Sequence, residues 1–308
     1  MPLLSGNVSC TRFNVISMPE ELNFEQQAFQ LLNPGSSIKE RAGFVPFELD
    51  EPYEMGHKKW AFRVRKDKIT VDSTLMKERF KELVKIEHEQ VAPPSPKKKR
   101  ELRQLAEDEL LARTAPRSKI IECLLEHGVL LVGSISKEHT DTVFELMRRI
   151  GVEMEYKTPW AELGQELESP LVDASDPGKS VLGCHFLKKL LEDPTVFVEP
   201  EKGRIKLITA EGTNVTLTGS VLGEMTRYLE EGAEILSAKL IINETGVSFD
   251  GLSYQLVGMK IGKVEGDHWT EVLLERVDPV NAMWELLDEK YIQVMNPDNE
   301  SEVADEMP

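Results

Sequence analysis

The stretch GVLLVGSISKEHTDTVFELMRRIG occupies residues 128–151 and combines a strand pattern with a helix pattern. The β-branched and leucine residues between Gly128 and Gly133 predict a strand. Ser136 is a preferred residue for capping the start of a helix, and the apolar spacing after it predicts a helix that stops at Gly151. Two arginines in its last turn complement the carbonyl end of the helix dipole. This unit favours a protein that mixes helices and strands.

Another strand is predicted upstream, where the sequence WAFRVR alternates between two kinds of residue. Trp60, Phe62 and Val64 fall on one face of such a strand, and Arg63 and Arg65 fall on the other. One face is therefore expected to be buried and the other to be cationic. A solvent-facing sheet surface explains the two arginines equally well.

A helical hairpin is predicted directly after this strand. Asp72 and Ser73 are suitable N-caps for a helix over residues 74–90, and a proline-rich turn ends that helix. A second helical run follows and closes at Pro116. The turn ends in four consecutive cations, which gain most from a polyanion and otherwise form a solvated turn: Lys97, Lys98, Lys99 and Arg100.

The rest of the chain predicts a second folded region. Residues 159–180 are rich in Pro, Gly, Ser and Asp, so a domain junction is expected there. Patterns beyond it predict strands at 204–209, 238–242, 247–249 and 255–261, and helices ending near 192, at 220–231 and at 280–291. The expected parts are a central α/β domain (1–72 and 117–165), a helical hairpin domain (73–116), a base α+β domain (166–295) and a disordered acidic tail (296–308).

Charge is distributed unevenly along the chain. The protein has 308 residues, 40% of them hydrophobic, and a net charge of −17, so it is expected to fold rather than to be disordered. Residues 58–119 nevertheless contain 18 Lys and Arg against 10 Asp and Glu, and the remainder contains 19 against 44. This asymmetry predicts a local cationic surface on an acidic, self-repelling body.

Cysteine usage and hydropathy point to a cytoplasmic protein. Cys10, Cys123 and Cys184 are far apart and form no pair with metal-ligand or disulfide spacing, which favours a reducing compartment. No apolar run approaches the roughly 20 residues that a membrane helix needs, and no secretory signal is visible. No membrane partner is therefore expected.

The patterns with catalytic potential are incomplete. The tripeptide GKS at 178–180 lacks the glycine that a phosphate-binding loop needs five positions earlier, where Asp173 stands, so a turn is expected. Glu155 and Lys157 match half of a Mg²⁺-dependent nuclease site, with Asp141 as the nearest candidate for the missing aspartate. The six histidines show no metal-ligand spacing. We therefore expect no catalytic residue, cofactor or metal, with an exonuclease as the alternative.

Several short motifs resemble, in order and spacing, those of the bacterial recombination-associated protein RdgC family. The most specific is the strand and helix of residues 128–151. The others are Gly43-Phe44-Val45-Pro46, Arg65-Lys66 with Met76-Lys77, Pro116-Arg117, Glu230-Glu231-Gly232 with Leu240, Val247-Ser248-Phe249 and Met259-Lys260-Ile261.

This resemblance implies an α+β fold of mixed and antiparallel sheets with flanking helices and a protruding helical hairpin, in a ring-shaped homodimer. The central hole would admit double-stranded DNA, bound with little sequence preference, and the protein would restrain strand exchange promoted by RecA. The implied partners are double-stranded DNA, a second copy of the chain and RecA, and the implied location is the nucleoid in the cytoplasm. A scaffold whose basic hairpin docks an acidic protein is a further alternative.

Two departures from the family pattern affect the site. Lys119 stands where the family has an aromatic residue at the gate of the ring, which favours a charge contact there. Asn214 to Leu217 replace the Lys-Gln-Asp-Leu segment, so DNA contacts from that loop are not carried over. Motif and charge together give the expected DNA-binding residues: Arg63, Arg65, Lys66, Lys77, Lys97, Lys98, Lys99, Arg100, Arg117 and Lys119.

Overall fold

The computed structural model describes residues 3–36, 38–90, 93–173, 176–198 and 201–296. Within them the chain is an α+β protein built on a large antiparallel sheet, as expected. The strands are β1 (Val8–Ser17), β2 (Glu40–Val45), β3 (Glu54–Gly56), β4 (Lys59–Lys68), β5 (Arg117–Glu126), β6 (Val129–Val132), β7 (Glu153–Tyr156), β8 (Val196–Phe197), β9 (Arg204–Ile208), β10 (Asn214–Thr218), β11 (Glu234–Ile242), β12 (Thr245–Asp250) and β13 (Gln255–Met259). The helices are α1 (Ser73–Gln90), α2 (Pro96–Leu111), α3 (Lys137–Arg149), α4 (Pro159–Glu162), α5 (Leu182–Leu190), α6 (Met225–Glu230) and α7 (Trp269–Met295), with 3-10 turns η1 (Phe24–Gln27) and η2 (Gly219–Glu224).

Strand β1 joins the two halves of the sheet. Its residues 8–10 pair with β13, whereas residues 11–14 pair with β6 and residues 13–17 pair with β7. The main order of strands is β10-β9-β11-β12-β13-β1-β6-β5-β4-β2. Because one strand belongs to both halves, the side chains near its middle lie in the joint between them.

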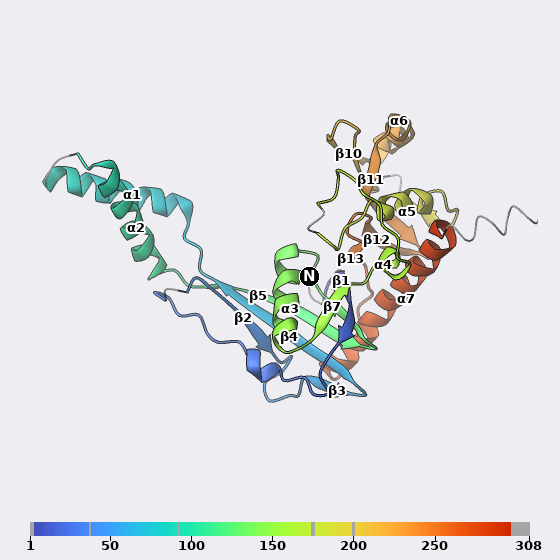
Figure 1. Cartoon of the computed structure of the whole chain (residues 1–308), viewed down its shortest axis with the longest axis horizontal. Coiled ribbons are helices and arrows are strands. Elements are labelled where there is room, and N and C mark those ends of the chain that lie inside the picture. The colour runs from blue at the N-terminus through green and yellow to red at the C-terminus, as the bar shows by residue number, and fades with distance from the viewer. Residues whose placement is uncertain (1–2, 37, 91–92, 174–175, 199–200, 297–308) are drawn as a thin grey trace, which may run out of the picture.

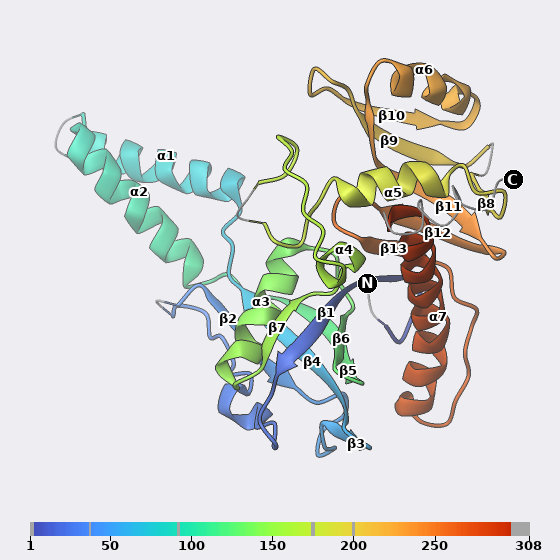
Figure 2. The ribbon, with the colours of Figure 1, turned by 45° about the vertical axis from the view of Figure 1, so that its right-hand side comes forward.

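Each half of the sheet has its own hydrophobic core. In the β2–β6 half, Phe62 and Val64 of β4 pack with Val143 and Met147 of α3. In the β9–β13 half, helices α5 and α7 cover the strands in a larger core. Figure 2 shows these two helices on the far side of β1 from α3. The predicted domain boundaries stay a prediction.

The hairpin of α1 and α2 projects away from the rest of the chain (Figure 1). Asp72 begins it by accepting hydrogen bonds from the backbone N–H of Thr74 and Leu75, at 2.7 and 3.1 Å. Leu83 and Leu102 are buried between the two helices. A straight helix of the 18 residues of α1 is about 27 Å long, because each residue adds about 1.5 Å.

The four consecutive cations were expected in the turn of this hairpin, and that expectation is wrong. They lie in the first turns of α2, which begins at Pro96. Ser95 caps the helix, since its side chain accepts a hydrogen bond from the backbone N–H of Lys98. Proline at the first helical position lacks an N–H that would have no partner there, so Pro96 starts α2 rather than prolonging the turn.

The last helix is longer than the sequence pattern predicts. Residues 280–291 were expected to be helical, whereas α7 begins at Trp269 and continues through Pro279. Proline removes one backbone hydrogen bond of the helix. Leu273 and Val277 before Pro279 and Val280 after it are nevertheless buried, so the parts of α7 on both sides of the proline pack against the core.

Other departures are local. The stretch 220–231 is divided into η2 and α6, and β5 was not predicted as a strand. No helix within the described parts of the chain is both long and apolar enough to span a membrane. The acidic tail expected at 296–308 lies outside the described residues except for Asn296.

Candidate nucleic-acid interface

Strand β4 has the two faces that its alternation predicts, but its half-buried arginines already bind other groups of the protein. Arg63 donates to the carbonyl oxygens of Pro46, at 2.8 Å, and Phe47, at 2.5 Å. Arg65 binds both carboxylate oxygens of Asp67, at 2.9 and 2.8 Å, and its guanidinium lies 4.4 Å from the centre of the Phe29 ring. These contacts hold the two arginines in place and leave few donors for an external phosphate.

Lys66 is buried on the opposite face of β4, beneath α3. Only 7% of the residue is exposed, and its Nζ lies 2.8 Å from Glu40 and 2.9 Å from Glu138. Burial acts to lower the pKa of Lys66, but the hydrogen bonds to Glu40 and Glu138 outweigh it and raise the pKa. Lys66 is thus a charged internal partner that ties β2 and α3 to β4.

Two predicted residues of β5 lie near the root of the hairpin, and both are exposed. In the β4–β5 register, Lys119 is opposite Lys66 and Arg117 is opposite Lys68. Both therefore share the face of Lys66. Lys77 is also exposed and lies one turn into α1. We call Lys77, Arg117 and Lys119 the root set.

The other four predicted cations lie at the far end of the hairpin, and we call them the tip set: Lys97, Lys98, Lys99 and Arg100. Lys97, Lys99 and Arg100 are exposed. Lys98 is half-buried, and its Nζ lies 3.7 Å from Glu87 and 3.9 Å from Glu101. Because α2 has 16 residues, the tip set is on the order of 20 Å from the root of the hairpin.

The positive charge of the hairpin is concentrated at its far end. Residues 97–103 contain five cations and one acidic residue, whereas residues 107–109, near the root, are all acidic. Arg79 is neutralised by Glu109 at 2.6 Å and Glu82 at 3.0 Å. Arg103 belongs to the cationic end and is exposed, although the motif reasoning did not select it. Its place in the same helix as the lysine run was the signal that could have found it.

The half-motif of a nuclease site is not completed by the fold. Tyr156 packs against the core beneath α3, and Asp141, an exposed residue of α3, lies near its hydroxyl on that side of the sheet. Glu155 and Lys157 precede and follow Tyr156 and therefore point to the opposite face of the sheet. Lys157 is paired with Glu162. The three residues of the hypothesis are thus divided between two faces.

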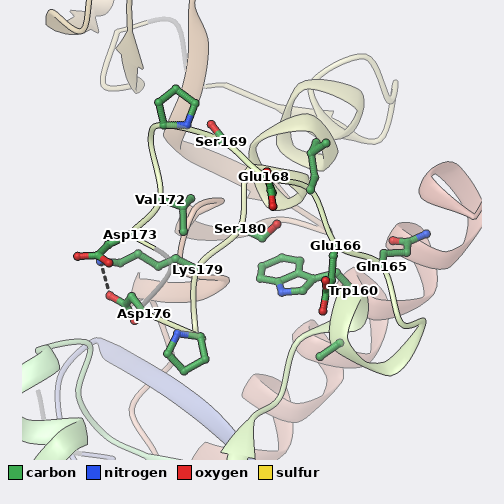
Figure 3. A pocket seen from close by; sticks show the side chains of 14 residues that line it. Trp160, Gln165, Glu166, Glu168, Ser169, Val172, Asp173, Asp176, Lys179 and Ser180 are labelled. Atoms are coloured by element: carbon green, nitrogen blue, oxygen red, sulfur yellow. Dashed lines mark ion pairs between the residues drawn. The ribbon is translucent and has the colours of Figure 1, made fainter.

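The GKS tripeptide lies beside a cavity of about 870 Å³ (Figure 3). Lys179 is paired with Asp176 at 2.9 Å, on the side of the cavity opposite Trp160. Gly178 packs on the Tyr156 ring so closely that a Cβ atom would come within 2.9 Å of it. The glycine therefore serves close packing in a loop, in agreement with the turn that was expected.

A comparison with protein families finds a match. The model described as "RdgC: Putative exonuclease, RdgC" matches residues 7–164, just over half of the chain. This range runs from the start of β1 to the end of α4 and contains the whole root set and tip set. No curated protein matches the chain.

Proposed function

Because the chain belongs to the RdgC family, we propose that it is a recombination-associated protein that binds double-stranded DNA with little sequence preference. The observation that carries this proposal is the exposure of six of the seven cations of the root set and the tip set on a chain whose net charge is −17. Lysine and arginine contacts to phosphate release condensed counterions and do not read bases. Because Arg63, Arg65 and Lys66 already bind other groups of the protein, we assign the phosphate contacts to the other seven predicted residues.

A ring-shaped homodimer is the assembly that we propose for this binding. The hairpin and the β9–β10 ribbon project from two ends of the molecule, with the central sheet between them (Figures 1 and 2). Two such bent subunits, related by a twofold axis, would surround a duplex and bring both sets of cations close to its phosphates. Encircled DNA on the nucleoid would be less accessible to RecA, which would restrain recombination.

Fluorescence anisotropy with labelled duplexes tests the binding proposal. We expect the full chain to bind two duplexes of unrelated sequence at low salt with affinities within about threefold of each other, because phosphate contacts carry little sequence information. Absence of binding to either duplex would reject the proposal. Binding to an acidic protein that is indifferent to excess duplex DNA would favour the scaffold instead.

The family description names an exonuclease, so the same duplexes are also used to measure DNA degradation. End-labelled DNA incubated with the full chain and Mg²⁺ is expected to stay intact, because Asp141 and Glu155 are on different faces of the sheet. Degradation by the wild-type chain that is lost in Glu155→Gln would establish the nuclease alternative. The variant Glu153→Gln, on the same face of β7, is the matched control.

A further inference from the structure

Glu48, Glu51 and His268 form a cluster of potential metal ligands away from the hairpin. One ligand atom from each residue lies within 4.8 Å of the other two. Within the described residues, this is the group of three such side chains whose ligand atoms are close enough to hold one metal ion. Glu48 and Glu51 come from the loop after β2, and His268 is the N-cap of α7. More than 200 positions of sequence separate the two contributions, so spacing along the chain gives no indication of the cluster.

The side chain of His268 is oriented by its neighbour in α7. Its Nδ1 accepts a hydrogen bond from the backbone N–H of Thr270, at 3.4 Å, and lies 2.8 Å from the Thr270 hydroxyl. The other ring nitrogen, Nε2, therefore points at Glu51, whose Oε1 is 3.0 Å away. When a metal ion replaces the proton on Nε2, the neutral ring carries its proton on Nδ1, which then donates to the Thr270 hydroxyl.

The carboxylate of Glu51 is also held in place. Trp269 Nε1 donates to its Oε2, which leaves Oε1 directed toward His268. The Trp269 ring in turn stacks on Phe47, with ring centres 4.4 Å apart and an angle of 7° between the planes. Arg63 fixes the backbone beneath this stack by binding the carbonyl oxygen of Phe47. Contacts from the loop after β2 and from the start of α7 thus hold the side chains of the cluster in place.

The spacing of these atoms suits a divalent transition-metal ion. Ligands about 2.1 Å from a tetrahedral metal ion are about 3.4 Å apart. The 3.0 Å between His268 Nε2 and Glu51 Oε1 is a hydrogen-bond distance that has to widen by only a few tenths of an ångström around an ion. Among the described residues no lysine or arginine forms an ion pair with Glu48 or Glu51. Apart from the imidazole of His268, the two carboxylates have no basic partner among those residues, which favours a cation between them.

We propose that Glu48, Glu51 and His268 bind one divalent transition-metal ion, for which Zn²⁺ is the probe, and that this ion clasps the loop after β2 to the start of α7. One imidazole and two carboxylates provide three protein ligands, and water completes the coordination. The site is structural and is independent of DNA binding, so its test does not rely on the proposed function.

Titration calorimetry of the full chain with Zn²⁺ tests this site. The wild-type chain should bind one Zn²⁺ per subunit, and its thermal midpoint should rise when the ion is present. Two variants should each weaken binding by at least about tenfold. Glu48→Gln removes a ligand from an exposed side chain, and His268→Asn removes the imidazole while keeping a residue that caps helices well.

The matched control is His185→Asn. His185 Nε2 lies 3.5 Å from the carboxylate of Glu234, and no second acidic partner pairs with it within the described residues. This variant should bind Zn²⁺ as the wild-type chain does. Absence of a saturable site in the wild-type chain would overturn the proposal, and so would unchanged binding in both Glu48→Gln and His268→Asn.

Discussion

The buried pair of Arg12 and Asp288 lies at the joint between the two halves of the sheet. The Arg12 guanidinium donates to both carboxylate oxygens of Asp288, at 2.9 and 2.8 Å, and lies 4.1 Å from the centre of the Trp284 ring. The hydroxyl of Tyr254 donates to the same carboxylate at 2.9 Å. Only 6% of the Arg12 side chain is exposed, against 20% of the Asp288 side chain, so water is excluded from the arginine and reaches only part of the carboxylate.

Removing one partner of this pair should destabilise the protein strongly. Arg12→Ala leaves the Asp288 carboxylate in the joint without its cation, and we expect a loss of about 3 kcal/mol in the free energy of unfolding. Arg148→Ala is the control, because Arg148 forms an exposed pair with Glu145 and should change stability by less than about 0.5 kcal/mol. Urea unfolding measures both. Equal effects of the two variants would contradict this role of Arg12.

At the residue scale, the sequence identified which cations are present but not what they contact. The alternation of β4 correctly placed Arg63 and Arg65 on the face opposite Phe62. Their partners come from other segments, however: Arg63 binds backbone carbonyls of the loop after β2, and Lys66 binds Glu138 of α3. Contacts of this kind depend on tertiary structure, which local patterns do not encode.

At the element scale, local signals predicted the hairpin, α3 and the strands β4, β6, β9, β11, β12 and β13, whereas long-range packing decided the extent of α7. Both helices of the hairpin have capping residues that the sequence displays, Asp72 and Ser95. The first part of α7 could not be predicted in the same way, because Pro279 indicates a helix boundary. Its helical state depends on burial against strands that are distant in sequence.

The connection between α5 and α7 predicts a dependence of stability on pH. Asp193 follows α5 and lies 2.5 Å from Lys290 of α7. Hydrogen bonds from Lys290 and Thr195 lower the pKa of Asp193 to about 2. A folded-state pKa below the ordinary value of 3.8 stabilises the fold above about pH 4, and this contribution is lost as the pH falls toward 2.

The variant Asp193→Asn isolates this contribution. After allowance for solvent screening, we expect it to be about 1 kcal/mol less stable than the wild-type chain at pH 6, with the difference disappearing toward pH 2. Urea unfolding at several pH values measures the difference. A gap between the two proteins that stays constant from pH 6 to the lowest accessible pH would contradict the assignment.

At the scale of the whole molecule, charge is separated between the hairpin and the rest. The sequence predicted this separation, because the numbers of charged residues show an excess of cations in residues 58–119. It did not predict that the exposed members divide into a root set and a tip set with acidic residues between them. That division follows from the length of α2, which carries Glu107 to Glu109 toward the sheet.

The proposed assembly predicts a dimer in solution. Sedimentation equilibrium should give about twice the 34.9 kDa mass of one chain at micromolar concentration. A ring needs both subunits, so weakening of the dimer should also weaken duplex binding. A mass of one chain at all concentrations would contradict encirclement while leaving phosphate binding by a single subunit possible.

The salt dependence of duplex affinity tests most directly whether the exposed cations of the hairpin bind phosphates. Affinity is measured against salt concentration for the wild-type chain, for a variant with the four tip-set residues changed to Ala, and for the control Lys188→Ala, Lys189→Ala. Each lost phosphate contact should reduce the logarithmic slope by about 0.9, so the tip variant should lose about 3.6 for each subunit that contacts the duplex, and the control nothing. An equal slope for all three proteins would contradict the account.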